Sequence, residues 1–249
     1  MKLLELDPII SSTREKLDKL GVKGILYDLD DTLIYTAEIF YYWMNEYADI
    51  VSFELGIERE MFYKTLSAVN DEEYRRMGVS PSRWRAVVER LGKMYDGGRS
   101  VVEGRLDVLM NIYKTVPRMR PGVRAALGTL KELGFRQALI THANEDWTMW
   151  KLDKLGLWDN FDAIFIADEN GHKSAQHWNK GMDMLGLTPN KCLVVGDNLG
   201  GDITPAASLG ARTIWMPSPW SVYRAGTVPE GTVQIGEFNE FLEALARLK

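Results

Sequence analysis

The sequence has little cysteine, no excess of basic residues and no long apolar run, and each shortage excludes a class of protein. A single cysteine, Cys192, among 249 residues excludes an internal disulfide, and no spacing of cysteine and histidine suggests a structural zinc site. The formal net charge of −5 gives no reason to expect a nucleic-acid-binding face. No segment approaches the roughly eighteen uninterrupted apolar residues that predict a membrane span.

The rest of the composition is that of a soluble globular protein, with 45% hydrophobic and 26% charged residues. The N-terminus carries charges at Lys2, Glu5 and Asp7 and does not look like a secretory signal, so we expect a reducing, cytoplasmic setting. The chain is long enough for one large domain, or for one domain with a sizeable insertion. Neither repeats nor low-complexity tracts are present.

Strand-like apolar segments alternate with helices of about ten residues through most of the chain, which predicts βα units and a parallel sheet. We therefore predict an α/β fold, a doubly wound parallel sheet with a Rossmann-like core. Strands are expected at 24–27, 135–140, around 164, around 193 and at 211–215. Helices are expected at 11–20 (capped by Ser12 or Thr13), 123–133, 147–155, 175–185, from 202 to 210, and at 238–248.

The segment 36–116 is too long to be a plain loop and has a helical, aromatic-rich pattern. We expect it to form a helical domain of its own, inserted into a core made of residues 1–35 and 117–249. On the pattern alone it could be an independent bundle with no part in function. It includes a basic region from Arg83 to Arg90, which we interpret as a solvated helix face.

Two carboxylates follow the first strand, at Asp28 and Asp30. If the strand stays extended through Asp30, both side chains lie on the same face, because side chains alternate with a period of two. Carboxylates held so close repel each other unless a cation or a shared proton relieves the repulsion. Such a pair suits a metal-assisted nucleophile with a neighbouring acid/base, although an isolated pair is more often a solvated acidic turn.

Polar groups also follow three other strands. Thr141 and His142 follow one strand, Lys173 comes shortly after the next, and the last group, Asp197, Asn198 and Asp202, follows a third. Ligands bind outside the carboxyl ends of the strands in open parallel sheets, so we expect all four groups to converge on one site.

This set of motifs resembles the haloacid dehalogenase superfamily, specifically its aspartate-dependent phosphohydrolases. The first family motif, Asp-x-Asp-x-Thr, matches Asp28, Asp30 and Thr32; the second, a Thr or Ser at a strand end, matches Thr141; the third, a lone Lys, matches Lys173; the fourth, Gly-Asp-x-x-x-x-Asp, matches Gly196, Asp197 and Asp202. The resemblance spans most of the chain outside residues 36–116, and in this family an insertion at that place is a helical cap over the active site.

The resemblance implies a role for each matching carboxylate. Asp28 would be the nucleophile that forms an aspartyl-phosphate, and Asp30 would be the general acid and then the general base. We expect crowding between the two to raise one of their pKa values. Mg²⁺ would be held by the carboxylates of Asp28 and Asp197 and by the backbone carbonyl of Asp30.

The remaining residues have competing interpretations. Lys173 would offset the negative charge, and Thr141 would donate a hydrogen bond to a phosphate oxygen. Thr32, His142, Asn198 and Asp202 would bind phosphate or support the residues that do. Thr141, Thr32 and Asp202 could instead cap helices, and His142 could have no chemical role. We assign no role to Trp220, Tyr223 and Arg224.

The leading functional hypothesis is Mg²⁺-dependent hydrolysis of a small phosphorylated metabolite, with no nucleic-acid or membrane partner. A phosphomutase would use the same Asp28 and Asp30. A haloacid dehalogenase would have no need for the acid/base Asp30. A signalling receiver domain places its acidic pair before its Thr and Lys, whereas Asp197 and Asp202 come last here. A non-catalytic binding protein on the same fold is the remaining alternative.

Overall fold

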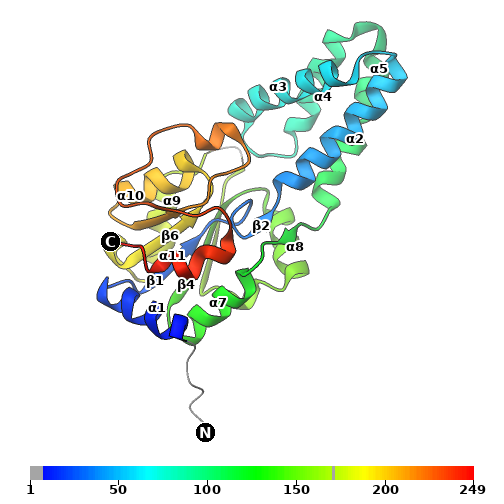
Figure 1. The fold of residues 1–249 in the computed structure, drawn as a ribbon. Helices are drawn as coiled ribbons and strands as arrows, with labels where there is room; N and C mark the ends of the chain where they lie inside the picture. Colours follow the sequence, from blue (N-terminus) through cyan, green and yellow to red (C-terminus); the bar gives the residue numbers. More distant parts are fainter. Residues whose placement is uncertain (1–7, 170–171) are drawn as a thin grey trace.

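The structure is a computed structural model that describes residues 8–169 and 172–249, and its core is a six-stranded parallel sheet (Figure 1). The strands are β1 Gly24–Tyr27, β4 Arg136–His142, β5 Ala163–Ala167, β6 Cys192–Gly196, β7 Arg212–Trp215 and β8 Val233–Gln234. They lie in the order β5-β4-β1-β6-β7-β8, and every neighbouring pair is parallel. The chain order therefore reverses between β1 and β6, which is the position where open sheets bind ligands.

Helices cover both faces of this sheet because side chains on each strand alternate between them. Ile25 and Tyr27 pack with residues of α1 (Pro8–Lys19), α7 (Val123–Glu132) and α11 (Phe241–Leu245). Leu26 between them points to the other face and packs with residues of α9 (Ala175–Met184) and α10 (Thr204–Ser208). The predicted fold class, a doubly wound parallel sheet, is confirmed.

Several local predictions need correction. The first helix begins at Pro8, so Ser12 and Thr13 lie inside it and do not cap it. The segment after Asn198 starts as a π-helical turn, Leu199–Ile203, before α10. The C-terminal helix is short, with the 3₁₀ turn Phe238–Glu240 followed by α11. The charged residues at positions 2, 5 and 7 lie outside the described residues.

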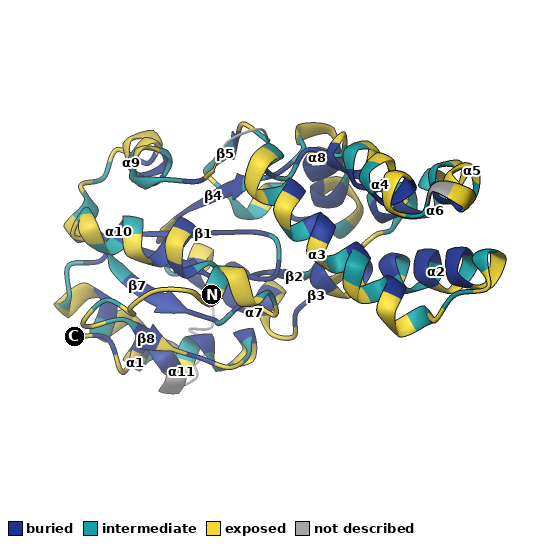
Figure 2. Cartoon of the chain, turned by 90° about the horizontal axis from the view of Figure 1, so that it is seen from above, coloured by how far each residue is buried: buried dark blue, intermediate teal, exposed yellow. Residues whose placement is uncertain are grey.

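The inserted segment is helical, as predicted. It consists of α2 Ala37–Leu55, α3 Arg59–Met77, α4 Arg83–Met94, α5 Arg99–Gly104 and α6 Leu106–Met110, with 3₁₀ turns at Asp96–Gly98 and Asn111–Lys114. These helices form an elongated lobe beyond one edge of the sheet (Figures 1 and 2). The lobe has its own buried cluster, with Tyr47, Phe62 and Trp84 among its largest members.

A small antiparallel pair of strands joins the lobe to the sheet. Ile34 of β2 (Ile34–Tyr35) pairs with Met119 of β3 (Arg118–Met119), so the chain leaves the core and returns to it at the same place. The inserted helices therefore begin and end near the carboxyl end of β1. None of the helices in the described residues combines the length and the apolar character needed to cross a lipid bilayer.

Candidate active site

The four polar groups that follow the strands meet at the carboxyl edge of the sheet. Asp28 follows β1, and its amide donates a hydrogen bond to the carbonyl of Val195 on β6, at 2.9 Å. This hydrogen bond holds the ends of β1 and β6 together, and Asp197 follows directly after β6. One cavity of about 120 Å³ is lined by the predicted residues Asp28, Asp30, His142, Lys173, Asp197, Asn198 and Asp202.

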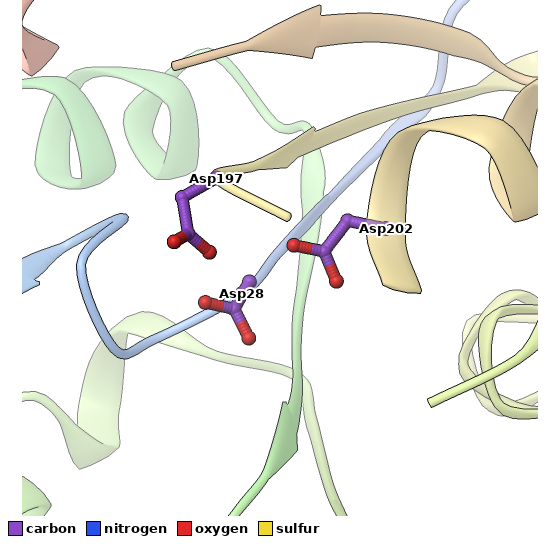
Figure 3. A group of neighbouring side chains, drawn as sticks. All are labelled: Asp28, Asp197 and Asp202. Atoms are coloured by element: carbon purple, nitrogen blue, oxygen red, sulfur yellow. The ribbon is translucent and has the colours of Figure 1, made fainter. Parts of the chain in front are cut away.

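Three buried carboxylates form the centre of this cavity (Figure 3). Asp28, Asp197 and Asp202 each offer one oxygen, and these oxygens all lie within 4.8 Å of one another. Glycine at 196 permits this approach, because a Cβ added there would lie 2.5 Å from Oδ2 of Asp202. Carboxylate oxygens this close together are compatible with a shared cation.

Lys173 is the cation that the cluster already contains. Its Nζ forms an ion pair with Asp28 and another, at 2.7 Å, with Oδ1 of Asp202. The other oxygen of Asp202 accepts a hydrogen bond from the amide of Asn198 at 3.0 Å. Burial disfavours the charge on Lys173, but the two carboxylates outweigh this effect and raise its pKa. Asp202 therefore has partners for both oxygens, one of which is Lys173.

The other two carboxylates are left with more negative charge than the site compensates. Burial raises the pKa of Asp28 to about 7, against the lowering effect of Lys173. Burial also raises the pKa of Asp197 well above its usual value, and the charges of Asp28 and Asp202 add to this rise. Oδ2 of Asp197 is buried and accepts no hydrogen bond from any described residue. An added cation would relieve this unfavourable arrangement.

Asp30 lies apart from this cluster. Its Oδ1 accepts hydrogen bonds from the hydroxyl of Thr36 and from Nζ of Lys151, both at 2.5 Å. The expected crowding with Asp28 is therefore only a small effect: Asp30 contributes least to the raised pKa of Asp28, and burial contributes most. β1 ends at Tyr27, so Asp30 lies outside the strand and forms an isolated bridge with Ile34.

Lys151 is a residue that the sequence did not single out. It lies on α8 (Glu145–Leu155), its side chain is fully buried, and its Nζ lies 3.9 Å from the ring centroid of Trp147, one turn earlier. A lysine on the buried face of an amphipathic helix is unusual. The position of Lys151 on the apolar face of the predicted helix is the feature of the sequence that could have identified it. Asp28 and Asp30 thus pair with different lysines, and Asp28 shares Lys173 with Asp202.

Asp31 fixes the turn that leads from the sheet into the lobe. It has a positive φ of 60°, and its Oδ1 accepts hydrogen bonds from the amides of Thr36 and Ala37 at the start of α2. Its Oδ2 accepts a hydrogen bond from Nε1 of Trp220 at 3.2 Å, and burial raises its pKa to about 6. Trp220, to which the sequence assigned no role, therefore contacts the acidic turn.

The helix-capping interpretations of the motif residues are wrong. Asn144 caps α8 in place of Thr141, and Asn198 caps the π-helical turn in place of Asp202. The hydroxyls of Thr32 and Thr141 are buried, and neither has a hydrogen-bond partner within residues 8–169 and 172–249. Neither threonine lines the cavity.

His142 lines the cavity next to Lys173. Burial, followed by the charge of Lys173, lowers the pKa of His142 to about 4, so the ring is neutral at neutral pH. Its Nε2 has no hydrogen-bond partner in the described part of the chain. A neutral ring can accept or donate a hydrogen bond to a ligand there.

The helical lobe supplies the other wall of the cavity. Its residues there are Phe40, Asn70, Asp71, Tyr74, Val79 and Arg83, and Trp147, Trp220 and Tyr223 of the core face them. Hydrogen bonds hold the lobe against the core: Glu169 accepts from the amide of Val79 at 3.0 Å and from the hydroxyl of Ser80 at 2.8 Å. Arg83 is only 4% exposed, so the expectation of a solvated basic face is wrong at this residue.

Comparison with known proteins agrees with this geometry. The model of the haloacid dehalogenase-like hydrolases matches residues 22–210. The chain belongs to this family. A glyceraldehyde 3-phosphate phosphatase of Pyrococcus abyssi is 27% identical over 198 residues, which are 78% of this chain and 81% of that protein. A phosphoglycolate phosphatase of Aquifex aeolicus is 32% identical over 198 residues, 77% of this chain and 83% of that protein.

The comparison with solved structures agrees with the fold described above. A haloacid dehalogenase-like hydrolase from Xanthomonas campestris superposes with a TM-score of 0.72 over 90% of this chain and 91% of its own, at 17% identity. This likeness supports the fold alone. With the family match and the phosphatases among the relatives, it confirms the prediction of a haloacid dehalogenase-type phosphohydrolase.

Proposed function

We propose that this enzyme hydrolyses small phosphate monoesters with Mg²⁺, through a phosphorylated Asp28. The observation that carries the proposal is the buried group of Asp28, Asp197 and Asp202 around a single lysine. In the same proposal, residues 36–116 are a helical cap over a core of residues 1–35 and 117–249. A cytoplasmic setting stays a prediction.

The donor set fits magnesium. All the available groups are oxygens, which Mg²⁺ prefers, and Oδ2 of Asp197 is buried without a partner among the described residues. Asp28, Asp197 and the backbone carbonyl of Asp30 would hold the ion, because both oxygens of Asp202 already have partners. When bound, the ion supplies charge neutralisation of the phosphoryl group and the carboxylates.

The residues of the chain then divide the reaction between them. An oxygen of ionised Asp28 forms a bond to phosphorus as the bond to the leaving oxygen breaks, and Asp30 protonates that oxygen. Asp30 next takes a proton from the water that attacks the phosphorus atom. The bond between phosphorus and the Asp28 oxygen breaks, which restores the carboxylate of Asp28 and releases inorganic phosphate. Lys173 offsets negative charge during both steps. The buried hydroxyl of Thr141 has no partner among the described residues, and it would have to turn toward the cavity to donate to a phosphate oxygen.

The lobe residues that line the cavity support the choice of a small substrate. The cavity is about 120 Å³ and is bounded by aromatic side chains of both the lobe and the core. Such a lid excludes water and contacts the part of the substrate that is not phosphate. Relatives named as phosphatases of glyceraldehyde 3-phosphate and phosphoglycolate support a substrate of a few carbon atoms.

Phosphate release from a panel of small phosphate esters tests the proposal. We expect release with Mg²⁺, none in excess chelator, and recovery when Mg²⁺ is restored. Isomerised sugar phosphate without free phosphate would indicate a phosphomutase, and halide release from haloacids would indicate a dehalogenase. Ligand binding without any product would indicate a binding protein. Each of these three results would overturn the proposal.

A further inference from the structure

The lobe places a buried arginine against the cavity. Arg83 is the first residue of α4 and is 4% exposed, yet it lines the same cavity as Asp28. Its Nη1 donates to the carbonyl of Gly78 at 2.6 Å. Its Nε is buried and has no hydrogen-bond partner among the described residues. One edge of the guanidinium is therefore held by the backbone, and the edge that carries Nε is unused.

This guanidinium also lacks an acidic partner. No carboxylate oxygen of a described residue lies within 4.0 Å of Arg83. Asp71 on α3 feels the charge of Arg83, which acts to lower the pKa of Asp71, but the two side chains form no ion pair. An arginine cannot lose its proton, so a buried one without a counter-ion is costly unless an anion binds to it.

Aromatic rings position Arg83 for such an anion. Its guanidinium carbon lies 5.6 Å from the ring centroid of Tyr74 and 5.2 Å from that of Trp84. These contacts restrict the side chain, and a restricted planar guanidinium is suited to paired hydrogen bonds with a carboxylate or a phosphate. Asn70, which lines the same cavity, is 5% exposed, and its Oδ1 likewise has no partner in the described residues.

We propose that the preferred substrate carries a second anionic group, a carboxylate or a second phosphate, which binds the Nε edge of Arg83 while the reacting phosphate lies at Asp28. This inference rests on the proposed function. Asn70 would bind a polar group between the two anions. The two relatives named above differ in this feature, because phosphoglycolate has a carboxylate where glyceraldehyde 3-phosphate has a neutral aldehyde.

Substrates that differ only at the second group give the first test, on the unmodified enzyme. We compare kcat/KM for 2-phosphoglycolate, for glycolaldehyde phosphate as its neutral counterpart, and for ethylene glycol bisphosphate. A buried charged pair predicts a preference of about 100-fold for one of the two anionic substrates over the neutral one. The better of the two anions identifies the second group as a carboxylate or as a phosphate. A preference for the neutral substrate, or none, would overturn the inference.

Variants locate the effect. Arg83→Gln should remove most of the preference for the anionic substrate, and Arg83→Lys should restore part of it. Arg85→Gln, at an exposed position on the same helix, should leave the preference as it is. If thermal melting shows that Arg83→Gln does not fold, Arg83→Lys and the substrate comparison still decide. An equal loss of kcat/KM on all substrates would contradict a binding role for Arg83.

Hydrolysis of p-nitrophenyl phosphate separates the two levels of the proposal. If the enzyme hydrolyses this ester with Mg²⁺ but shows no preference for a second anion, only the inference about Arg83 fails. If it hydrolyses no phosphate ester, the proposed function fails and the inference fails with it.

Discussion

Replacement of Asp28 by asparagine should stabilise the metal-free protein more at pH 7.5 than at pH 5.5. Burial raises the pKa of this carboxyl from 3.8 to about 7. Between these values the folded protein holds a proton that the unfolded chain has lost, so the free energy of unfolding falls as the pH rises. The amide that replaces the carboxyl in Asp28→Asn does not titrate, and its contribution to stability does not change with pH.

The size of the effect follows from the pH interval. Between pH 5.5 and pH 7, about 1.5 units, one proton changes the free energy of unfolding by about 2 kcal/mol. The free energy of unfolding of Asp28→Asn minus that of the wild type should therefore be larger at pH 7.5 than at pH 5.5 by about 2 kcal/mol. His142 has the opposite effect, because its pKa is lowered from 6.5 to about 4 and it destabilises the folded protein as the pH falls below 6.5. This contribution is present in both proteins and cancels when their stabilities are subtracted.

Urea unfolding in excess chelator at the two pH values provides the measurement, followed by the same experiment with Mg²⁺. Because the ion binds ionised carboxylates in competition with protons, Mg²⁺ should stabilise the wild type more at pH 7.5, and Asp28→Asn much less at either pH. A stability difference that is constant with pH would refute the reasoning that Asp28 is a buried, uncompensated carboxyl.

Two further predictions concern Lys151, which pairs with Asp30, and Thr141, to which we assign a phosphate contact. Lys151→Met should reduce kcat/KM by about 10- to 100-fold, because it leaves Asp30 without its buried lysine. Lys154→Met, on the exposed face of the same helix, should have no effect. Equal activity of the two variants would show that Lys151 does not position Asp30. Thr141→Val should reduce kcat/KM by about 10-fold or more. It should not lower thermal stability, since the hydroxyl makes no hydrogen bond to a described residue. Thr141→Ser should have nearly the kcat/KM of the wild type, and full activity of Thr141→Val would exclude the phosphate contact.

The predicted sheet agrees well with the structure because its signals are local. Apolar runs that end in glycine or in polar residues predicted β1 and β6, and the parallel arrangement brings their carboxyl ends together whatever the intervening helices do. For this reason Asp28 and Asp197 could be expected to meet. Asp202 was expected either to support the binding residues or to cap a helix. Its ion pair with Lys173 agrees with the first alternative, and the second is wrong because Asn198 is the cap.

The parts that could not be predicted depend on packing between distant segments. The ion pair of Lys151 with Asp30 joins residues 121 positions apart and requires α8 to lie against the acidic turn. Arg83 belongs to a segment of ordinary basic composition, and its burial depends on packing within the lobe, where it contacts Gly78 and Tyr74. Trp220 likewise reaches the cavity from a loop whose sequence indicates no regular structure.

Chemical trapping of the phosphorylated enzyme tests the central claim most directly. Borohydride reduces an acyl phosphate to an alcohol, so a phosphorylated aspartate becomes homoserine, which peptide mass spectrometry locates. With saturating p-nitrophenyl phosphate, whose leaving group needs no proton from Asp30, and Mg²⁺, the Asp30→Asn variant should accumulate the intermediate. It lacks the base for the second step, so homoserine should appear at position 28. Homoserine at another position, or an unmodified Asp28 in a variant that still releases the leaving group, would contradict the account.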